Sequence, residues 1–252
     1  MNMGKHSPVT LIIKAAKDFL NNPILAFPPL MAFLLLVLLS YLSQIISLNI
    51  SSNAGQIIWL FLYSIISLIF LSFSFTVLLF LALSLSKANH PKPYKILLSD
   101  SIIRAKSVWH RNFLNMILIA LSSMVLVLLA NFIGRMASLL GYSFAIIIFI
   151  LVMFSGLAGG IIFLTFSTSY AVINGSPVLE SIIFSARLVK TRYIEVLSII
   201  IFFLVLYKLI SFIPNVFFVE IIQSLIIAPI LSLVLVRFVL SSGGANVLPA
   251  QR

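Results

Sequence analysis

The chain contains no cysteine and little charge of either sign. Of its 252 residues, 8% are charged, and only 5 residues are acidic against 16 that are basic. The absence of cysteine excludes disulfides, thiolate metal sites and cysteine nucleophiles. The three histidines are too scattered to supply a spaced pair of metal ligands; they are His6, His90 and His110. We therefore expect no metal and no other cofactor.

Sequence motifs of enzymes are also missing. The five carboxylates are dispersed along the chain, and the sequence has no glycine-rich phosphate loop, no His-x-x-Glu-His and no Gly-x-Ser-x-Gly. We expect a protein that is not an enzyme. A lipid-modifying enzyme would require carboxylates that are distant in the sequence to converge in space.

Apolar residues, in contrast, are abundant. They make up 62% of the chain, whereas soluble proteins have roughly 45–50% apolar and about 25% charged residues. The net charge of +11 would suggest nucleic-acid binding in a soluble protein. Here the basic residues flank apolar segments, which the positive-inside rule explains more simply. We expect membrane lipids as partners and no nucleic acid.

The apolar segments predict six transmembrane helices. A bilayer core of about 30 Å requires about 20 apolar helical residues. The first apolar run, at 24–48, is too long for the core of a signal peptide and is expected to be a retained span. The six predicted spans cover residues 24–48, 57–86, 113–134, 142–173, 194–213 and 221–240.

The connections between these spans alternate in charge. Residues 1–23, 87–112, 174–193 and 241–252 together hold thirteen of the basic residues, whereas the opposite connections hold only Arg135. This asymmetry predicts a multi-pass protein of the cell membrane with both termini in the cytoplasm.

A basic amphipathic stretch precedes an apolar segment three times. Ser7-Pro8-Val9 and Ser176-Pro177-Val178 begin the first and third copies, and Asp100-Ser101-Ile102 lies within the second. Residues 1–252 are therefore interpreted as a single membrane domain with three parallel repeat units, 7–86, 91–173 and 176–241.

Each unit is expected to begin with an amphipathic helix on the cytoplasmic surface. Serine followed by proline is a favourable helix start. The apolar residues then recur at helical spacing, as in Leu98, Ile102, Ala105 and Trp109 or in Leu179, Ile182, Ala186 and Val189. The predicted fold class is an all-α polytopic membrane protein with six transmembrane helices, both termini inside and three such surface helices.

The basic residues of these surface helices are candidate contacts for anionic lipid. Each can contribute about 1 kcal/mol near a negatively charged membrane surface. The alternative is that they only set the orientation during insertion. The candidates are Lys14, Lys17, Arg104, Lys106, Arg187, Lys190 and Arg192.

Small and charged residues inside the spans have two interpretations each. Gly156, Gly159 and Gly160 favour close helix packing, and a hinge is the alternative. Lys208 and Glu220 flank the turn at Pro214, where they either pair near the outer surface or Lys208 alone extends (snorkels) to the membrane surface. No span is expected to carry an acidic residue at its centre.

Two segments resemble a known family. Residues 16–25, Ala-Lys-Asp-Phe-Leu-Asn-Asn-Pro-Ile-Leu, lead into Pro28-Pro29-Leu30, and Ser185-Ala186-Arg187-Leu188-Val189-Lys190 precedes the fifth span. Both are similar to segments of uncharacterised six-span membrane proteins, a group that includes the membrane domain of glycerophosphoryl diester phosphodiesterases and the YciC-type proteins. The resemblance implies a bare membrane domain, because the chain has no room for the phosphodiesterase domain.

The leading functional hypothesis is a non-enzymatic scaffold, assembly or lipid-organising module in the membrane. Under this hypothesis we expect the protein to assemble with another membrane protein or to form a homo-oligomer. The alternative is a small-solute transporter or channel built around the three repeats, which needs a polar path through the spans.

Overall fold

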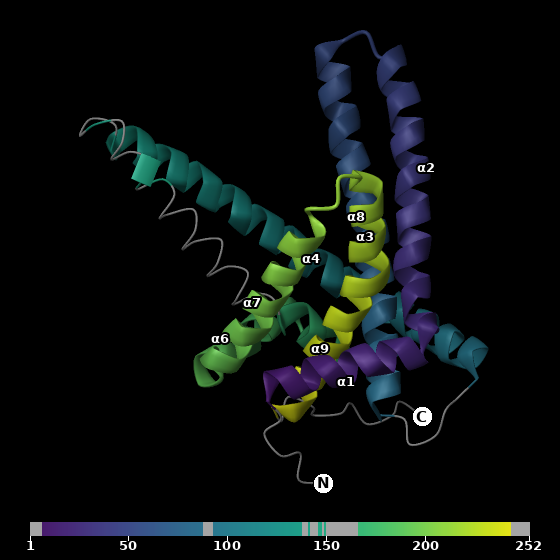
Figure 1. The fold of residues 1–252 in the computed structure, drawn as a ribbon. Coiled ribbons are helices and arrows are strands. Elements are labelled where there is room, and N and C mark those ends of the chain that lie inside the picture. Colours follow the sequence, from purple (N-terminus) through teal and green to yellow (C-terminus); the bar gives the residue numbers. More distant parts are fainter. Residues whose placement is uncertain are drawn as a thin grey trace.

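The computed structural model describes residues 7–87, 93–137, 141, 146–147, 149 and 166–242. These residues form helices, with no strand among them. Figure 1 shows two upright helical hairpins, a helix across their lower end, and the long α4 pointing away from them. The elements are α1 (Pro8–Asn21), the 3-10 turn η1 (Pro23–Ala26), α2 (Phe27–Asn49), α3 (Asn53–Lys87), α4 (Tyr94–Ala137), a helix at 166–174, α6 (Val178–Thr191), α7 (Tyr193–Ile210), α8 (Val216–Ile222), the π-helical turn η3 (Gln223–Ile227) and α9 (Ala228–Ser241).

Four of the described helical segments are long and apolar enough to cross a membrane. They are Pro23–Asn49, Asn53–Lys87, Tyr193–Ile210 and Val216–Ser241. They coincide with the predicted spans 24–48, 57–86, 194–213 and 221–240. The predicted span 113–134 lies inside α4, which is not among the four, and most of 142–173 lies outside the described residues. Six spans and the threefold repeat therefore stay predictions.

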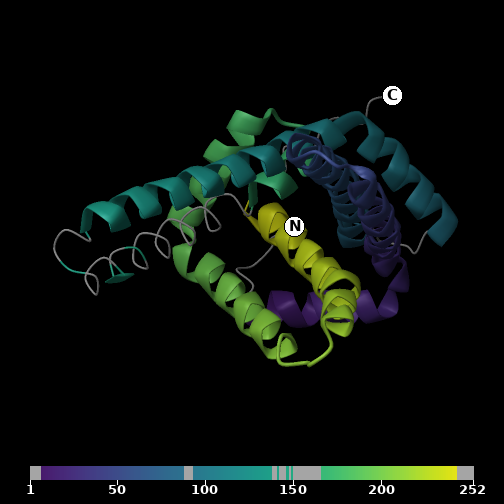
Figure 2. The same cartoon turned by 90° about the horizontal axis from the view of Figure 1, so that it is seen from above.

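The second predicted surface helix is not a separate element. It is continuous with the following apolar segment in α4, a single helix of 44 residues. No proline or glycine interrupts Tyr94–Asn131, so nothing in the sequence ends the helix after the basic stretch. In both views the C-terminal half of α4 extends away from the other labelled helices (Figures 1 and 2).

The two serine-proline helix starts form differently from the prediction. Helix α1 begins at Pro8 as expected, but the Ser7 side chain makes no capping hydrogen bond. Helix α6 begins at Val178, one residue later than predicted, with Pro177 at the capping position. Pro8, whose fixed φ suits the first helical position, therefore helps to start α1 without a serine cap.

The hydrophobic core lies at the end of the hairpins where α1 crosses them. Every residue from Val77 to Leu83 in α3 and from Ser232 to Val236 in α9 is buried. A helix that is buried all round lies inside a bundle. In contrast, Ile57, Phe61 and Leu42 near the opposite end of the α2–α3 hairpin are exposed, as expected of apolar surfaces that lipid covers.

Hydrogen bonds tie α3 to its neighbours on both sides. The Ser74 Oγ donates to the Pro28 carbonyl of α2 at 2.7 Å, and the Trp59 indole N–H donates to Ser43 Oγ at 2.9 Å. On the other side the buried Asn112 amide of α4 donates to the Ser72 carbonyl at 3.1 Å and to Thr76 Oγ1 at 3.0 Å. These bonds fix the axial register of α2, α3 and α4.

Replacing Asn112 by Ala should weaken the α3–α4 contact. Interhelical hydrogen bonds in membrane proteins contribute about 0.6 kcal/mol on average and up to about 1.7 kcal/mol. We expect Asn112→Ala to lower the free energy of unfolding by about 1–2 kcal/mol in detergent micelles, measured by thermal or denaturant unfolding. Asn131→Ala is the control, because the exposed Asn131 amide donates only to Val127 of its own helix. Equal losses in the two variants would contradict the proposed role of Asn112.

Candidate functional site

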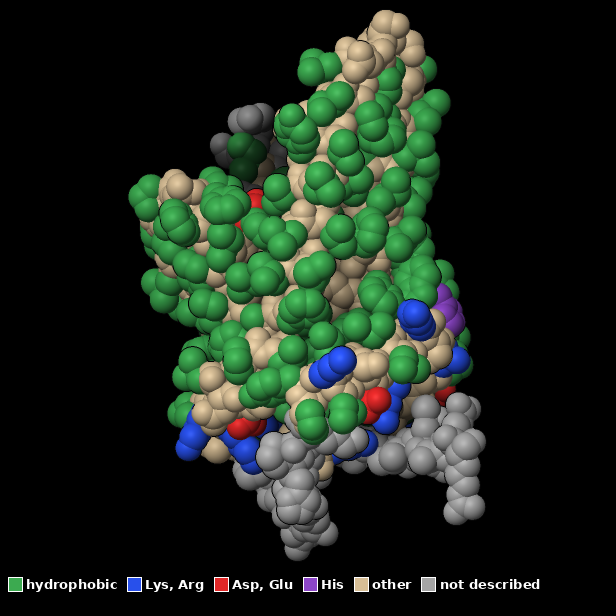
Figure 3. Space-filling model, turned by 90° about the vertical axis from the view of Figure 1, so that its right-hand side faces the viewer, with side chains coloured by type: hydrophobic (Ala, Val, Ile, Leu, Met, Phe, Trp, Pro, Cys, Tyr) green, Lys and Arg blue, Asp and Glu red, His purple; other side chains and the backbone are tan. Residues whose placement is uncertain are grey.

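Exposed basic side chains gather at one end of the molecule. Figure 3 shows Lys and Arg side chains below a body of hydrophobic side chains. The end is built from three helices that are distant in the sequence, and the Tyr94 hydroxyl of α4 lies 3.4 Å from the Asn21 carbonyl of α1. We call this surface the basic end and define it by the exposed residues Lys14 and Lys17 of α1, Arg104 and Lys106 of α4, and Arg187 and Lys190 of α6.

Helix α1 presents three different sides. Leu11 and Ala15 are 4% and 0% exposed where the helix contacts the bundle. At 100° per residue, Val9, Ile13 and Leu20 share a second side, and all three are well exposed. Lys14 and Lys17 occupy the sector between these two sides, together with Thr10 and Asn21. One docked, one apolar and one basic side suit a helix that lies along a membrane surface.

An ion pair joins α1 to α9. The Asp18 carboxylate contacts the Arg237 guanidinium, and the two side chains are 29% and 12% exposed. An arginine close to the end of an apolar segment requires a partner, because burial removes the water that would otherwise solvate its charge. Asp18 supplies that charge and at the same time holds α1 across the end of α9.

A second arginine, one of the predicted lipid contacts, has protein partners inside the basic end. Arg192 contacts Glu195, donates to Ser241 at 3.1 Å and Ser242 at 2.8 Å, and lies 4.2 Å above the Phe238 ring. Its guanidinium therefore joins the start of α7 to the end of α9. Arg192 is a structural residue of this network, unlike the six exposed cations of the basic end.

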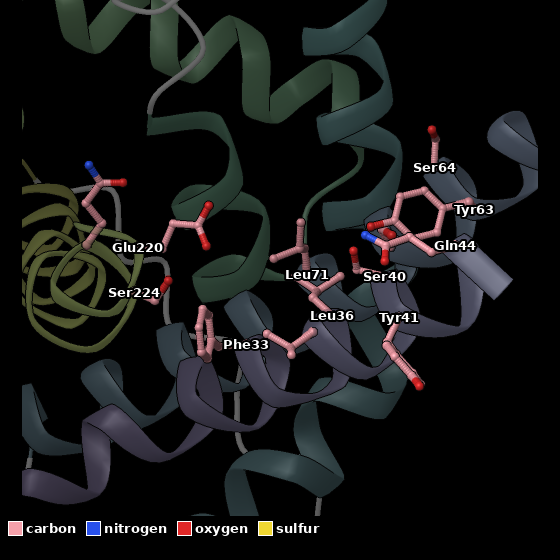
Figure 4. A pocket seen from close by; sticks show the side chains of 13 residues that line it. Phe33, Leu36, Ser40, Tyr41, Gln44, Tyr63, Ser64, Leu71, Glu220 and Ser224 are labelled. Atoms are coloured by element: carbon pink, nitrogen blue, oxygen red, sulfur yellow. The ribbon is translucent and has the colours of Figure 1, made fainter. Parts of the chain in front are cut away.

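A groove lined by both polar and apolar side chains lies between the two hairpins. It has a volume of about 720 Å³ and is lined by α2, α3, α8 and η3. Figure 4 shows Glu220 and Ser224 on one wall, facing Leu36, Ser40 and Leu71 on the other. We call it the lateral groove and define it by the lining residues Ser40, Gln44, Ser64, Ser67, Glu220, Gln223 and Ser224.

The two hairpins reach different heights, which determines the position of Glu220. The Phe217 ring of α8 lies 5.7 Å from the Phe33 ring of α2. Since α2 continues from Phe33 to Asn49, about 24 Å of that helix extends past the contact. Figure 1 likewise shows the α7–α8 turn well short of the α2–α3 turn. Glu220 is one helical turn beyond Phe217 and therefore lies beside the apolar body of α2.

The expected alternatives for Lys208 and Glu220 are resolved by this geometry. The Lys208 ammonium lies 5.7 Å from the Phe212 ring, and no ion pair between Lys208 and Glu220 is found among the described residues. Glu220 is instead part of the lateral groove. The glutamate that was expected near the outer surface is the charged residue of the groove wall.

The three glycines predicted to favour close helix packing, Gly156, Gly159 and Gly160, lie outside the described residues.

The sequence analysis did not identify Gln44 and Gln223 as residues that line the groove. Glu220, Gln223 and Ser224 have the i, i+3, i+4 spacing of one helix face within an otherwise apolar segment, and this spacing is the signal that could have identified the groove wall.

Comparisons with known proteins give no further assignment. No family model, no curated protein and no solved structure matches the chain. The resemblance of residues 16–30 and 185–190 to six-span membrane proteins therefore stays a prediction.

Replacing Asp18 by Asn should release α1 from the end of α9. The amide keeps the size of the side chain but removes the charge that compensates Arg237. We expect the α1 amides to exchange roughly tenfold faster in a hydrogen–deuterium exchange measurement, since local opening would become more favourable by about 1.4 kcal/mol. Glu180→Gln serves as the control, because Glu180 is exposed on α6. Unchanged exchange in α1 of the Asp18→Asn variant would contradict the account of its docking.

Proposed function

We propose that the protein is a non-enzymatic membrane module that organises anionic lipid at its basic end and acts as a scaffold in the bilayer. The observation that supports this most directly is the convergence of exposed cations from α1, α4 and α6 on one end of an apolar helical body. Anionic lipid headgroups attract such a surface with about 1 kcal/mol for each Lys or Arg.

The pairing of the acidic residues strengthens this proposal. Asp18 and Glu195, both at the basic end, are paired with Arg237 and Arg192. Those two carboxylates therefore compensate arginines that are built into the bundle and not the exposed lysines and arginines around them. In the described part of the chain, no ion pair is found for the six residues that define the basic end.

The orientation belongs to the same proposal. We place the basic end and both termini in the cytoplasm, with the α2–α3 and α7–α8 turns toward the outer side of a cell membrane. The support is the charge asymmetry between the connections and the four apolar helical segments. The repeat interpretation fits the order of surface helix followed by hairpin in α1–α3 and in α6–α9.

Single cysteines would test the orientation, because the chain has no cysteine of its own. Ser51→Cys lies in the α2–α3 turn and Ser99→Cys lies in the first turns of α4, and both positions are exposed. We expect a membrane-impermeant maleimide to label Ser51→Cys in intact cells and to label Ser99→Cys only after permeabilisation. Labelling in the reverse pattern would contradict the orientation.

Neutralising the cations of α1 should weaken binding of anionic lipid. We expect phosphatidylglycerol to raise the unfolding temperature of the purified protein more than phosphatidylcholine does. In Lys14→Gln/Lys17→Gln the loss of two contacts of about 1 kcal/mol each should weaken phosphatidylglycerol binding roughly thirtyfold, and high salt should weaken it further in the wild type. Native mass spectrometry of bound lipid supplies the affinities.

The control variant is Ser51→Asp/Asn53→Asp. It lowers the net charge by the same amount, but at exposed positions of the opposite turn. We expect it to bind phosphatidylglycerol as the wild type does. Equal weakening in both variants would show a dependence on net charge alone, and purification from membranes without any bound lipid or protein would contradict the scaffold proposal.

A further inference from the structure

The lateral groove has features of a ligand site that are independent of the basic end. Its polar residues form three rows, Ser40–Gln44 on α2, Ser64–Ser67 on α3 and Glu220–Gln223 on α8 and η3. Residues three or four positions apart lie on the same side of a helix. The rows on α2 and α3 and the row on α8 and η3 therefore lie on facing sides of the groove (Figure 4), in the part of the molecule where nearby helix surfaces are apolar and exposed (Figure 3).

Two side chains of the groove have buried polar atoms without a hydrogen-bond partner. They are the Ser67 hydroxyl and the side-chain amide nitrogen of Gln223. Buried donors are normally satisfied, since an unmet hydrogen bond in a buried position costs about 1–3 kcal/mol. Both atoms are hydrogen-bond donors, so an acceptor such as a phosphate oxygen would satisfy them.

The groove wall also carries one charge. Glu220 is exposed and is the only charged residue among the lining residues. It lies beside the apolar body of α2, about 24 Å of helix away from that helix's outer end. A carboxylate is costly in that environment unless a positive group or hydrogen-bond donors accompany it. The groove therefore offers hydrogen-bond donors and a carboxylate, which complement a headgroup that carries both a phosphate and an amine.

The backbone at this wall is irregular. Gln223 begins the π-helical turn η3, and Pro229 lies in the first turn of α9. Because proline has no N–H to donate to the preceding turn, the regular α-helical hydrogen-bond ladder is interrupted there. Such π-helical turns are frequent at functional sites. Here the turn places the Gln223 side chain in the same groove as Glu220.

We propose that the lateral groove binds a lipid whose headgroup carries a primary ammonium next to a phosphate. Glu220 accepts hydrogen bonds from the ammonium, and Ser67 and Gln223 donate to the phosphate oxygens. The acyl chains lie against the apolar side chains of the groove, Phe33, Leu36 and Leu71. The volume of about 720 Å³ is in the range of small-molecule sites, and the shorter α7–α8 hairpin leaves the groove accessible from the bilayer.

Photo-crosslinking tests the proposal. The probe is phosphatidylethanolamine with a diazirine in one acyl chain, added to the full-length protein in nanodiscs of phosphatidylcholine. We expect labelled peptides from α2, α3 and α8. Unlabelled phosphatidylethanolamine should compete on the wild-type protein, whereas phosphatidylcholine, which has no N–H, and phosphatidylglycerol, which has no amine, should not.

Two variants change the groove in different ways. Glu220→Gln removes the charge, and we expect labelling of the groove to fall roughly tenfold or more. Ser40→Phe fills the groove and leaves Glu220 in place, and it should reduce labelling similarly. Glu180→Gln removes an exposed carboxylate from α6 and should label as the wild type does.

Two results would overturn the proposal. They are undiminished labelling in Glu220→Gln and equal competition by phosphatidylcholine on the wild type. Because the wild-type competition uses no variant, misfolding of a variant leaves the proposal testable. Binding of phosphatidylglycerol at the basic end is measured separately, so the two proposals can fail independently.

Discussion

The ion pair between Asp18 and Arg237 is the contact on which the arrangement of the basic end depends. It compensates an arginine near the end of α9 and docks α1, from the other end of the chain, across the bundle. Once Leu11 and Ala15 are buried by that docking, the helix has only its apolar and basic sides left for the surroundings. The positions of Lys14 and Lys17 are thus a consequence of an interaction that neither of them makes.

The two ends of the molecule differ in how closely their helices pack. Near the basic end, α3 and α9 are buried all round. There Arg192 links α7 to α9 through a hydrogen bond to Ser241 and a contact with the Phe238 ring. Away from it the hairpins separate, and α8 stops beside the first part of α2. A tight core at one end and hairpins of unequal height at the other produce the lateral groove with Glu220 in its wall. The lipid contacts that we propose at the two places therefore use different chemistry.

The sequence predicts the helical class and four of the spans well, because long apolar runs and flanking charges depend only on local composition. The predicted span 24–48 corresponds to Pro23–Asn49, and 57–86 to Asn53–Lys87. The roles of individual charges could not be predicted in this way. Arg192 and Lys190 are alike in sequence context, yet it is Arg192 that donates hydrogen bonds to Ser241 and Ser242. The position of Glu220 along α2 depends on the axial offset between the two hairpins, and the local sequence pattern does not determine that offset.

A double-mutant cycle on Asp18 and Arg237 tests whether this ion pair holds α1 on α9. Asp18→Asn, Arg237→Gln and the double variant would be compared with the wild type by the free energy of unfolding in detergent micelles. We expect each single variant to be less stable than the wild type. The double variant should lose clearly less than the sum of the two, because the second change removes a charge that the first has left unpaired. Strictly additive losses would contradict the account, since they would mean that the two residues stabilise the protein independently.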